Sequence, residues 1–314
     1  MADGFPATVA LIEAADEYRP LFSRHDIPLL YCRNRPEFTA AIESRGAGIR
    51  AIITRGTIKI EASDIQRLPS LEIICALGSG VETIDRDAAA ARSISVLANT
   101  GLNAPTVADH AMGLLLAVVR EIPAADSAIR RGEWRRLVPP GIAGKRLGVI
   151  GLGAIGTEVA RRAALGFGMD VSYHNRTPRA DIDYAYADTV EALAHWSDFL
   201  LVSAPSTTAT RHIVDRRVLR ALGPGGYLVN VSRGDLVDTE ALTECLRTAE
   251  TAGAALDVLE GEPAVPDVLR NLRNVVLTSH YAGRSPESTQ AAVDRSVGNL
   301  RQHFAIGGRR NEVK

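Results

Sequence analysis

The sequence predicts an α/β protein with two doubly wound parallel β-sheets, each covered by helices. Three observations lead to this fold class. Short apolar segments alternate with longer segments of helical character along the chain, which is typical of parallel sheets. The 314 residues are 46% hydrophobic, which is enough to bury more than one core. A glycine-rich turn also joins an apolar strand to a helix near the middle of the chain.

The first third of the chain contains five predicted strands and no phosphate-binding turn of its own. Helices are expected between the first strand and His25, and over residues 36–44 and 85–92. The strands are expected over residues 8–12, 27–31, 49–54, 71–76 and 94–97. This alternation favours a first domain with a parallel sheet.

A long apolar helix is predicted over residues 105–120, with Pro105 in its first turn. The segment that follows, at about residues 121–143, contains Trp134 and the pair Pro139-Pro140. Its composition fits a dimerisation arm, and it also fits a simple excursion over the surface.

The glycine-rich turn is the most informative stretch. Residues 147–150 are an apolar strand, a helix runs to about residue 166, and residues 169–174 form the next strand. The glycines between the strand and the helix have no Cβ atoms, so a pyrophosphate can closely approach the amides of the helix N-terminus. This context predicts a Rossmann domain whose dinucleotide site includes Gly151, Gly153, Ala154, Ile155 and Gly156.

The alternation continues to the end of the chain. Strands are expected at 199–203, 227–231, 254–256 and 275–278, and helices at 189–196, 239–249 and 285–304. We therefore expect a substrate-binding domain from residues 1–98 and 285–314, and a dinucleotide-binding domain from residues 99–284 that carries the arm.

Three strand ends in the second half carry reactive side chains. They are Ser232-Arg233-Gly234, Asp257 with Glu260-Gly261-Glu262-Pro263, and Ser279-His280-Tyr281-Ala282-Gly283. Ligands of open α/β sheets bind beyond the carboxyl ends of the strands, so all three segments are expected at one edge. Arg233 offers a planar fork for a carboxylate.

Composition excludes several other functions. The net charge is −1 and basic residues are dispersed, so neither nucleic acid nor a membrane surface is an expected partner. Three widely separated cysteines and the lack of a signal-peptide pattern predict a cytoplasmic protein. No ligand spacing typical of a metal site occurs, so no metal is expected.

In this order and spacing, these motifs resemble the D-isomer-specific 2-hydroxyacid dehydrogenases. The resemblance covers nearly the whole chain, including Asn99-Thr100-Gly101 and Val107-Ala108-Asp109-His110. It is strongest to glyoxylate/hydroxypyruvate and hydroxyphenylpyruvate reductases. It implies two doubly wound domains, flavodoxin-like for the substrate and Rossmann for the cofactor.

The resemblance also implies roles for individual residues. Arg233 would hold the substrate carboxylate and polarise the keto oxygen, and His280 would protonate that oxygen. Glu262 would stabilise the protonated imidazole, since a neighbouring carboxylate favours an imidazolium. The remaining implied contacts are Ser79 and Gly80 with the substrate, Asp257 with the nicotinamide carboxamide, and Pro205, Val231 and Gly283 with the cofactor. Arg55 follows a first-domain strand, and we treat it as a candidate contact for the far end of the substrate.

The cofactor preference follows from the end of the second Rossmann strand. NAD-binding sites place an acidic residue there, whereas this chain has Asn175, Arg176 and Thr177. A guanidinium can pair with a 2′-phosphate, so the sequence predicts NADPH over NADH. The alternative is that Arg176 is a solvated loop residue.

The sequence thus predicts an NADP-dependent oxidoreductase, a homodimer that reduces a 2-keto acid such as glyoxylate or hydroxypyruvate to the D-2-hydroxy acid. Two alternatives remain open. One is a related 2-hydroxyacid dehydrogenase that uses NADH. The other is a dinucleotide-sensing interaction protein, as the corepressors of this superfamily are.

Overall fold

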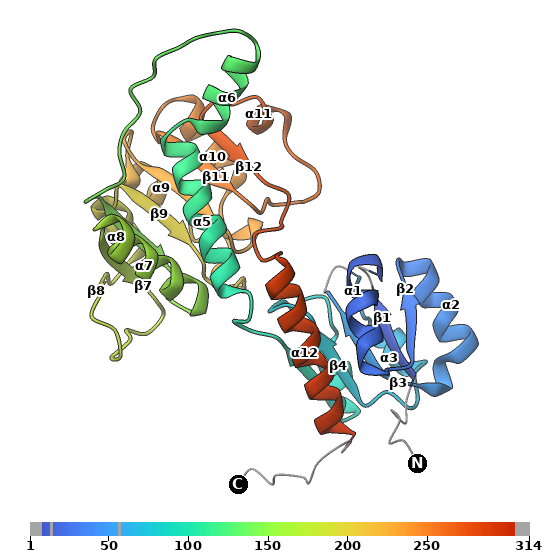
Figure 1. Ribbon diagram of the computed structural model, residues 1–314. Helices are drawn as coiled ribbons and strands as arrows, with labels where there is room; N and C mark the ends of the chain where they lie inside the picture. The colour runs from blue at the N-terminus through green and yellow to red at the C-terminus, as the bar shows by residue number, and fades with distance from the viewer. Residues whose placement is uncertain (1–7, 13–14, 56–57, 305–314) are drawn as a thin grey trace. The chain divides into compact units, whose positions relative to one another are not determined.

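The structure of the protein, a computed structural model, describes residues 8–12, 15–55 and 58–304 (Figure 1). The chain divides into two compact units. Unit 1 is Met1–Asn103 with Ser285–Lys314, and unit 2 is Ala104–Arg284. The ends of the chain, residues 1–7 and 305–314, lie outside the described residues.

The division after Asn103 differs from the predicted boundary after residue 98. The buried Asn99 explains the difference, because its side-chain amide donates to the Ala292 carbonyl and to Ser296 Oγ, both at 3.1 Å. These bonds keep the segment after the fifth strand with the last helix of unit 1.

Unit 1 is built on a five-stranded parallel sheet with the strand order β2-β1-β3-β4-β5, the flavodoxin-like order. The strands are β1 (Thr8–Ile12), β2 (Leu29–Cys32), β3 (Ile49–Thr54), β4 (Ile73–Ala76) and β5 (Ser95–Ala98). The helices are α1 (Ala15–Phe22), α2 (Arg35–Arg45), α3 (Ala62–Gln66), α4 (Arg86–Ala91) and α12 (Pro286–His303). Two 3₁₀ turns, Ser23–His25 and Gly46–Gly48, complete the unit.

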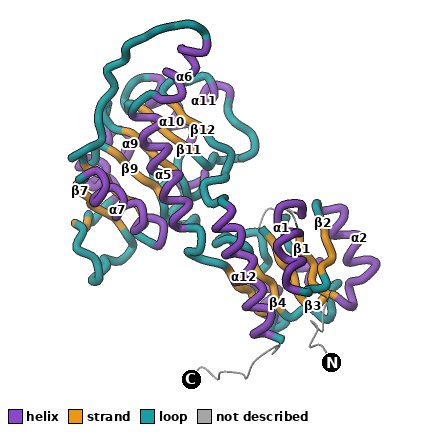
Figure 2. The backbone as a smooth tube through the Cα atoms, viewed as in Figure 1, coloured by secondary structure: helices purple, strands orange, loops and turns teal. Residues whose placement is uncertain are grey.

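Both faces of this sheet are covered, which explains why its strands are mostly apolar. Ala51 and Ile53 of β3 pack with residues of α1 and α12, whereas Ile52 packs on the opposite face with residues of α2 and α3. Alternate residues of one strand therefore enter different cores. Figure 2 shows α12 from the end of the chain beside β4.

Unit 2 is built on a seven-stranded parallel sheet with the order β12-β11-β10-β9-β6-β7-β8. The direction of winding reverses between β6 and β9, so the glycine-rich turn after β6 lies at the topological switch point where such sheets bind ligands. The strands are β6 (Arg146–Ile150), β7 (Asp170–His174), β8 (Ala185–Tyr186), β9 (Phe199–Val202), β10 (Tyr227–Asn230), β11 (Gly253–Leu256) and β12 (Val275–Leu277). The predicted fold class is confirmed for both sheets.

Helices of unit 2 cover the two faces of its sheet with separate cores. One core joins the sheet to α5 (Ala104–Val119) and α7 (Ala154–Phe167). The other joins it to α8 (Val190–Trp196), α9 (Arg216–Leu222), α10 (Thr239–Arg247) and α11 (Asp267–Arg270). The helix α5 packs on α7 and on β10, β11 and β12, and so lies behind the strand ends that carry the reactive residues.

The predicted arm contains a helix, α6 (Ile122–Arg130), followed by residues 131–145 without helix or strand (Figure 1). Trp134 and Val138 in this segment are 80% and 98% exposed. The short elements α3, α9, α11 and β8 were not predicted from the sequence. No helix among the described residues is long and apolar enough to cross a membrane.

Candidate active site

The three reactive segments follow three neighbouring strands. Arg233 lies three residues after β10, Asp257 directly follows β11, and Thr278 directly follows β12. These strands are parallel and adjacent in the order β10-β11-β12. Their carboxyl ends therefore meet at one edge of the unit 2 sheet, as predicted.

Asp257 organises the loop that carries His280. Its carboxylate is almost completely buried and accepts hydrogen bonds from Thr278 Oγ1 at 2.6 Å, from the Tyr281 amide at 3.1 Å and from the Ala282 amide at 3.0 Å. Its own carbonyl accepts from the His280 amide at 2.8 Å. The loop is thus wrapped around one carboxylate, which offsets the cost of burying this charge.

This wrapping holds His280 in an uncommon conformation. Its φ is 53°, in the left-handed region that residues other than glycine rarely adopt, and such strain often marks functional sites. His280 Nδ1 lies 2.5 Å from Glu262 Oε1. None of the described residues forms a hydrogen bond with Nε2, so this nitrogen can serve a ligand.

The turn before Arg233 is also fixed by hydrogen bonds. The buried Asn230 side chain donates to the Arg233 carbonyl at 2.9 Å and accepts from the Ser232 amide at 3.1 Å. Ser232 Oγ donates to the Ala204 carbonyl, which ties this turn to the segment after β9. The guanidinium itself donates to the Ser232 carbonyl at 2.9 Å.

The glycine-rich turn fits a dinucleotide. Gly151 has φ +91°, and a Cβ there would lie 2.5 Å from Ala204 Cα. A Cβ on Gly153 would meet no atom within 4 Å, so the backbone can be approached closely at this point. Gly153 is also the N-cap of α7, and no side chain caps the free amides of that helix. The Ala154 and Ile155 amides therefore lie where a pyrophosphate would accept hydrogen bonds.

The segment after β7 contains one exposed and one anchored arginine. No described residue forms a hydrogen bond or an ion pair with Arg176, which is exposed together with Thr177. Arg179 donates to the Leu152 carbonyl at 3.0 Å and to Thr157 Oγ1 at 3.1 Å. Arg179 also binds Asp181, and this hydrogen bond holds the pKa of that carboxyl below its usual range. Asn175 Oδ1 accepts from the Leu152 amide at 2.6 Å.

The other predicted site residues lie in different surroundings. In unit 2, Pro205 is exposed, Gly283 is half-buried and Val231 is buried in the core. In unit 1, Ser79 and Gly80 lie in the turn after β4, and Ser79 is exposed. Arg55 follows β3, and its guanidinium carbon lies 6.0 Å from the centre of the Tyr18 ring.

Several residues that build this edge were not among the predicted site residues. His110 on α5 contacts Thr278 Oγ1 at 3.1 Å, and its ring lies edge-on to Tyr281 at 4.9 Å. Because the Thr278 hydroxyl donates its one proton to Asp257, His110 Nε2 must be the donor. The only sequence signal for such residues was a polar side chain on an apolar helix (His110) or directly after an apolar strand (Asn230 and Thr278).

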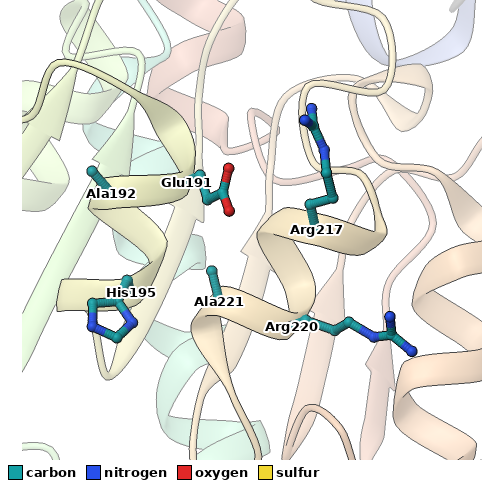
Figure 3. A pocket seen from close by; sticks show the side chains of 6 residues that line it. All are labelled: Glu191, Ala192, His195, Arg217, Arg220 and Ala221. Carbon is teal, nitrogen blue, oxygen red and sulfur yellow. The ribbon is translucent and has the colours of Figure 1, made fainter.

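Each unit has one surface cavity of note. One has a volume of about 560 Å³ and lies between α8 and α9, where Figure 3 shows Glu191, His195, Arg217 and Arg220 around it. The other has a volume of about 770 Å³ and is lined by residues 81–96 of unit 1. Neither cavity contains a predicted site residue. In the part of the chain that the structure describes, no group of three or more His, Cys, Asp or Glu residues could hold a metal ion.

Unit 2 is thus a dinucleotide-binding unit with an imidazole–carboxylate pair and an arginine at one sheet edge. Residues 112–282, more than half of the chain, match the family described as "D-isomer specific 2-hydroxyacid dehydrogenase, NAD binding domain". The chain belongs to the D-isomer-specific 2-hydroxyacid dehydrogenases, a family of oxidoreductases. The predicted family is confirmed.

Individual relatives agree with this assignment. The chain is 40% identical to glyoxylate/hydroxypyruvate reductase A of Arabidopsis thaliana over 273 residues, which is 86% of this chain and 87% of the relative. It is 39% identical to hydroxyphenylpyruvate reductase of Plectranthus scutellarioides, over 82% of this chain and 83% of the relative. The solved NADPH-dependent glyoxylate/hydroxypyruvate reductase of Sinorhizobium meliloti, in complex with NADP and malonate, has a TM-score of 0.87 and 34% identity, covering 96% of this chain and 95% of the other.

Proposed function

We propose that the protein reduces a 2-keto acid, such as glyoxylate, hydroxypyruvate or a related 2-oxo acid, to the D-2-hydroxy acid. The observation that carries this proposal is the 2.5 Å contact between His280 Nδ1 and Glu262 Oε1, at the same sheet edge as Arg233. Bound NADPH would supply the hydride to the carbonyl carbon.

In this proposal His280 is the acid. Its Nδ1 is held by Glu262, so Nε2 carries the proton that passes to the keto oxygen. The carboxylate stabilises the imidazolium before transfer and orients the ring throughout. Protonating the oxygen prevents negative charge from building up on it as the carbonyl is reduced.

Arg233 binds the substrate carboxylate in this proposal. A guanidinium can donate two parallel hydrogen bonds to a carboxylate, which fixes the keto group relative to His280. The hydrogen bonds of Asn230 fix the backbone from which Arg233 extends. Arg55, Ser79 and Gly80 of unit 1 are our candidates for further substrate contacts.

Our candidates for binding the pyrophosphate of the cofactor are Gly151, Gly153, Ala154, Ile155 and Gly156. Asp257, Pro205, Val231 and Gly283 are the candidates for its nicotinamide side, and Asn175, Arg176 and Thr177 for its adenosine ribose. The NADPH preference is supported by the exposed Arg176 and by the pairing of Arg179 with Asp181, the next acidic residue along the chain. The S. meliloti structure, which is described as NADPH-dependent, lends further support.

We also propose that the protein is a cytoplasmic homodimer. The arm at about residues 121–143 supports dimerisation, because Ile122, Ile129, Trp134 and Val138 expose at least half of their surface. An exposed apolar group of this kind is typical of a protein–protein contact. The three cysteines are free thiols, as is common in a reducing compartment.

The test is oxidation of NADPH and NADH by the purified protein with glyoxylate, hydroxypyruvate, phenylpyruvate, hydroxyphenylpyruvate and 2-ketogluconate. We expect turnover with at least one keto acid and a higher kcat/KM with NADPH. Tight dinucleotide binding without turnover of any of them would instead favour a dinucleotide-sensing interaction protein.

The role of Arg176 is tested separately. Arg176→Ala should lower kcat/KM for NADPH by roughly 10-fold or more and leave NADH almost unchanged, because it removes one charge-assisted contact to the 2′-phosphate. Arg247→Ala is the control, since Arg247 is an exposed arginine on α10 paired with Glu244. Equal loss with both cofactors would contradict this role.

A further inference from the structure

The turn at residues 259–262 carries two glutamates, and each is paired with a histidine. We call His280–Glu262 the inner pair and His212–Glu260 the outer pair. Both histidines have positive φ values, 53° for His280 and 51° for His212. A second strained histidine paired with the same short turn is not needed for the chemistry proposed above, so it requires an explanation of its own.

In the outer pair, one carboxylate meets two nitrogen-bearing side chains. His212 Nε2 lies 3.0 Å from Glu260 Oε1 and 3.2 Å from Oε2. Arg211 Nη2 donates to the same Oε1 at 2.7 Å. The His212 amide donates to the Asp235 carbonyl at 2.8 Å, which connects His212 to the segment after Arg233. Among the described residues, the charged side chains paired here are thus Arg211 and Glu260, and Asp235 contributes its backbone carbonyl.

The turn between the pairs is short, and its Leu259 end is buried. The Glu262 amide donates to the Leu259 carbonyl, and the Leu259 amide donates to Glu262 Oε2, both at 3.3 Å. On its other side the turn lies directly against Gly234, where a Cβ would be 2.0 Å from the Leu259 carbonyl carbon. Glu260 and Glu262 therefore belong to one turn that is closed by hydrogen bonds and anchored at Leu259.

We propose that Glu260 and His212 are positioning residues that fix the turn so that Glu262 meets His280. This inference rests on the proposed function, in which His280 is the acid and Glu262 is the carboxylate that supports it. The outer pair ties the segment after β9, which carries the cofactor candidate Pro205, to the turn that carries the supporting carboxylate. It acts through Glu262 and touches neither substrate nor cofactor.

The partial exposure of the outer pair fits a positioning role better than a role in stabilising the fold. The side chains of His212 and Glu260 are 33% and 30% exposed, and partly exposed ion pairs contribute little to the free energy of unfolding. A tether on a turn of four residues can nevertheless decide where the neighbouring carboxylate lies, and small misplacements of catalytic groups are costly.

The experiment compares Glu260→Gln and His212→Asn with wild type in two measurements. The first is NMR titration of the His280 ring, assigned with His280→Gln, in which Glu262→Gln defines the full effect of losing the supporting carboxylate. The second is kcat with the best keto acid and NADPH. Glu244→Gln is the matched control, since Glu244 is a partly exposed glutamate that accepts from Arg247 at 2.8 and 3.0 Å.

We expect both variants to move the His280 titration part of the way toward that of Glu262→Gln and to lower kcat by about 5- to 10-fold, at the lower end of the effects of misplaced acid–base groups. Glu244→Gln should change neither. An unchanged His280 titration in both variants overturns the proposal, whatever happens to stability. If wild type reduces no keto acid, the proposed function fails, but the titration still decides whether the outer pair positions the inner one.

Discussion

The two histidine–glutamate pairs of the 259–262 turn have similar partners and different surroundings. In the outer pair, Glu260 is shared between His212 and Arg211, so its charge is balanced by a permanent cation. In the inner pair, Glu262 accepts from the Leu259 amide, and among the described residues His280 is the one cationic partner of its carboxylate. The inner histidine is also the more exposed, at 48% against 33%.

This difference fits the separate tasks that we propose for the two pairs. A carboxylate already bound to arginine gains little from a protonated imidazole, and such a pair serves as a tether. A carboxylate without an arginine stabilises the imidazolium more strongly and so favours a proton donor. Asp257 adds to the contrast, because its hydrogen bonds surround the backbone of His280 and not that of His212.

The largest contrast is expected between the two glutamates themselves. Glu262→Gln should lower kcat on the order of 100-fold, because a neutral amide no longer stabilises the protonated imidazole. Glu260→Gln should have a clearly smaller effect, as described above. Steady-state kinetics of both variants at saturating NADPH provides the test, and equal losses would remove the distinction between the pairs.

A second variant acts on the loop that carries His280 and leaves the printed contacts of the outer pair in place. Asp257→Asn replaces an oxygen that accepts amide hydrogen bonds with a group that cannot, so we expect a loss of about 1–3 kcal/mol in the free energy of unfolding. Loosening the loop around His280 should also lower kcat. Urea denaturation measures the first effect. A variant as stable as wild type would show that this network does not hold the loop.

The smallest effect is expected from the residue between the two glutamates. Gly261 has φ +78° and no atom within 4 Å of a built Cβ, so Gly261→Ala costs only backbone strain, about 1 kcal/mol. Because the turn is shared, kcat should fall a few-fold. Gly225→Ala is the control, since Gly225 has open space and no positive φ. If Gly261→Ala changes the free energy of unfolding but not kcat, strain in the turn does not reach the inner pair.

The fold could be predicted where strands are buried on both faces. The strand Ile49–Thr54 was predicted with the observed bounds, because its whole apolar run lies inside unit 1. The short helix Arg216–Leu222 was not predicted, since seven residues with three arginines show little periodicity. Its position depends on Asp215, whose side chain accepts from the Arg217 and Val218 amides.

The positions of the reactive segments at the sheet edge were predictable, because each directly follows an apolar strand. The contacts that hold these segments in place were not predictable, because they join residues far apart along the chain. His110 meets Thr278 across 168 residues, and His212 meets Glu260 across 48. A local pattern does not contain these contacts; they form only when α5, the segment after β9 and the turn at 259–262 pack around the strand ends.

The most direct test of the central claim, that His280 is the proton donor supported by Glu262, is the pH dependence of kcat for wild type and His280→Gln, together with NADPH binding by both. We predict that wild-type kcat falls as the imidazolium loses its proton with rising pH. His280→Gln should bind NADPH normally, lose on the order of 100-fold or more in kcat and lack that pH dependence. A variant that keeps both the wild-type kcat and its pH profile would contradict the account.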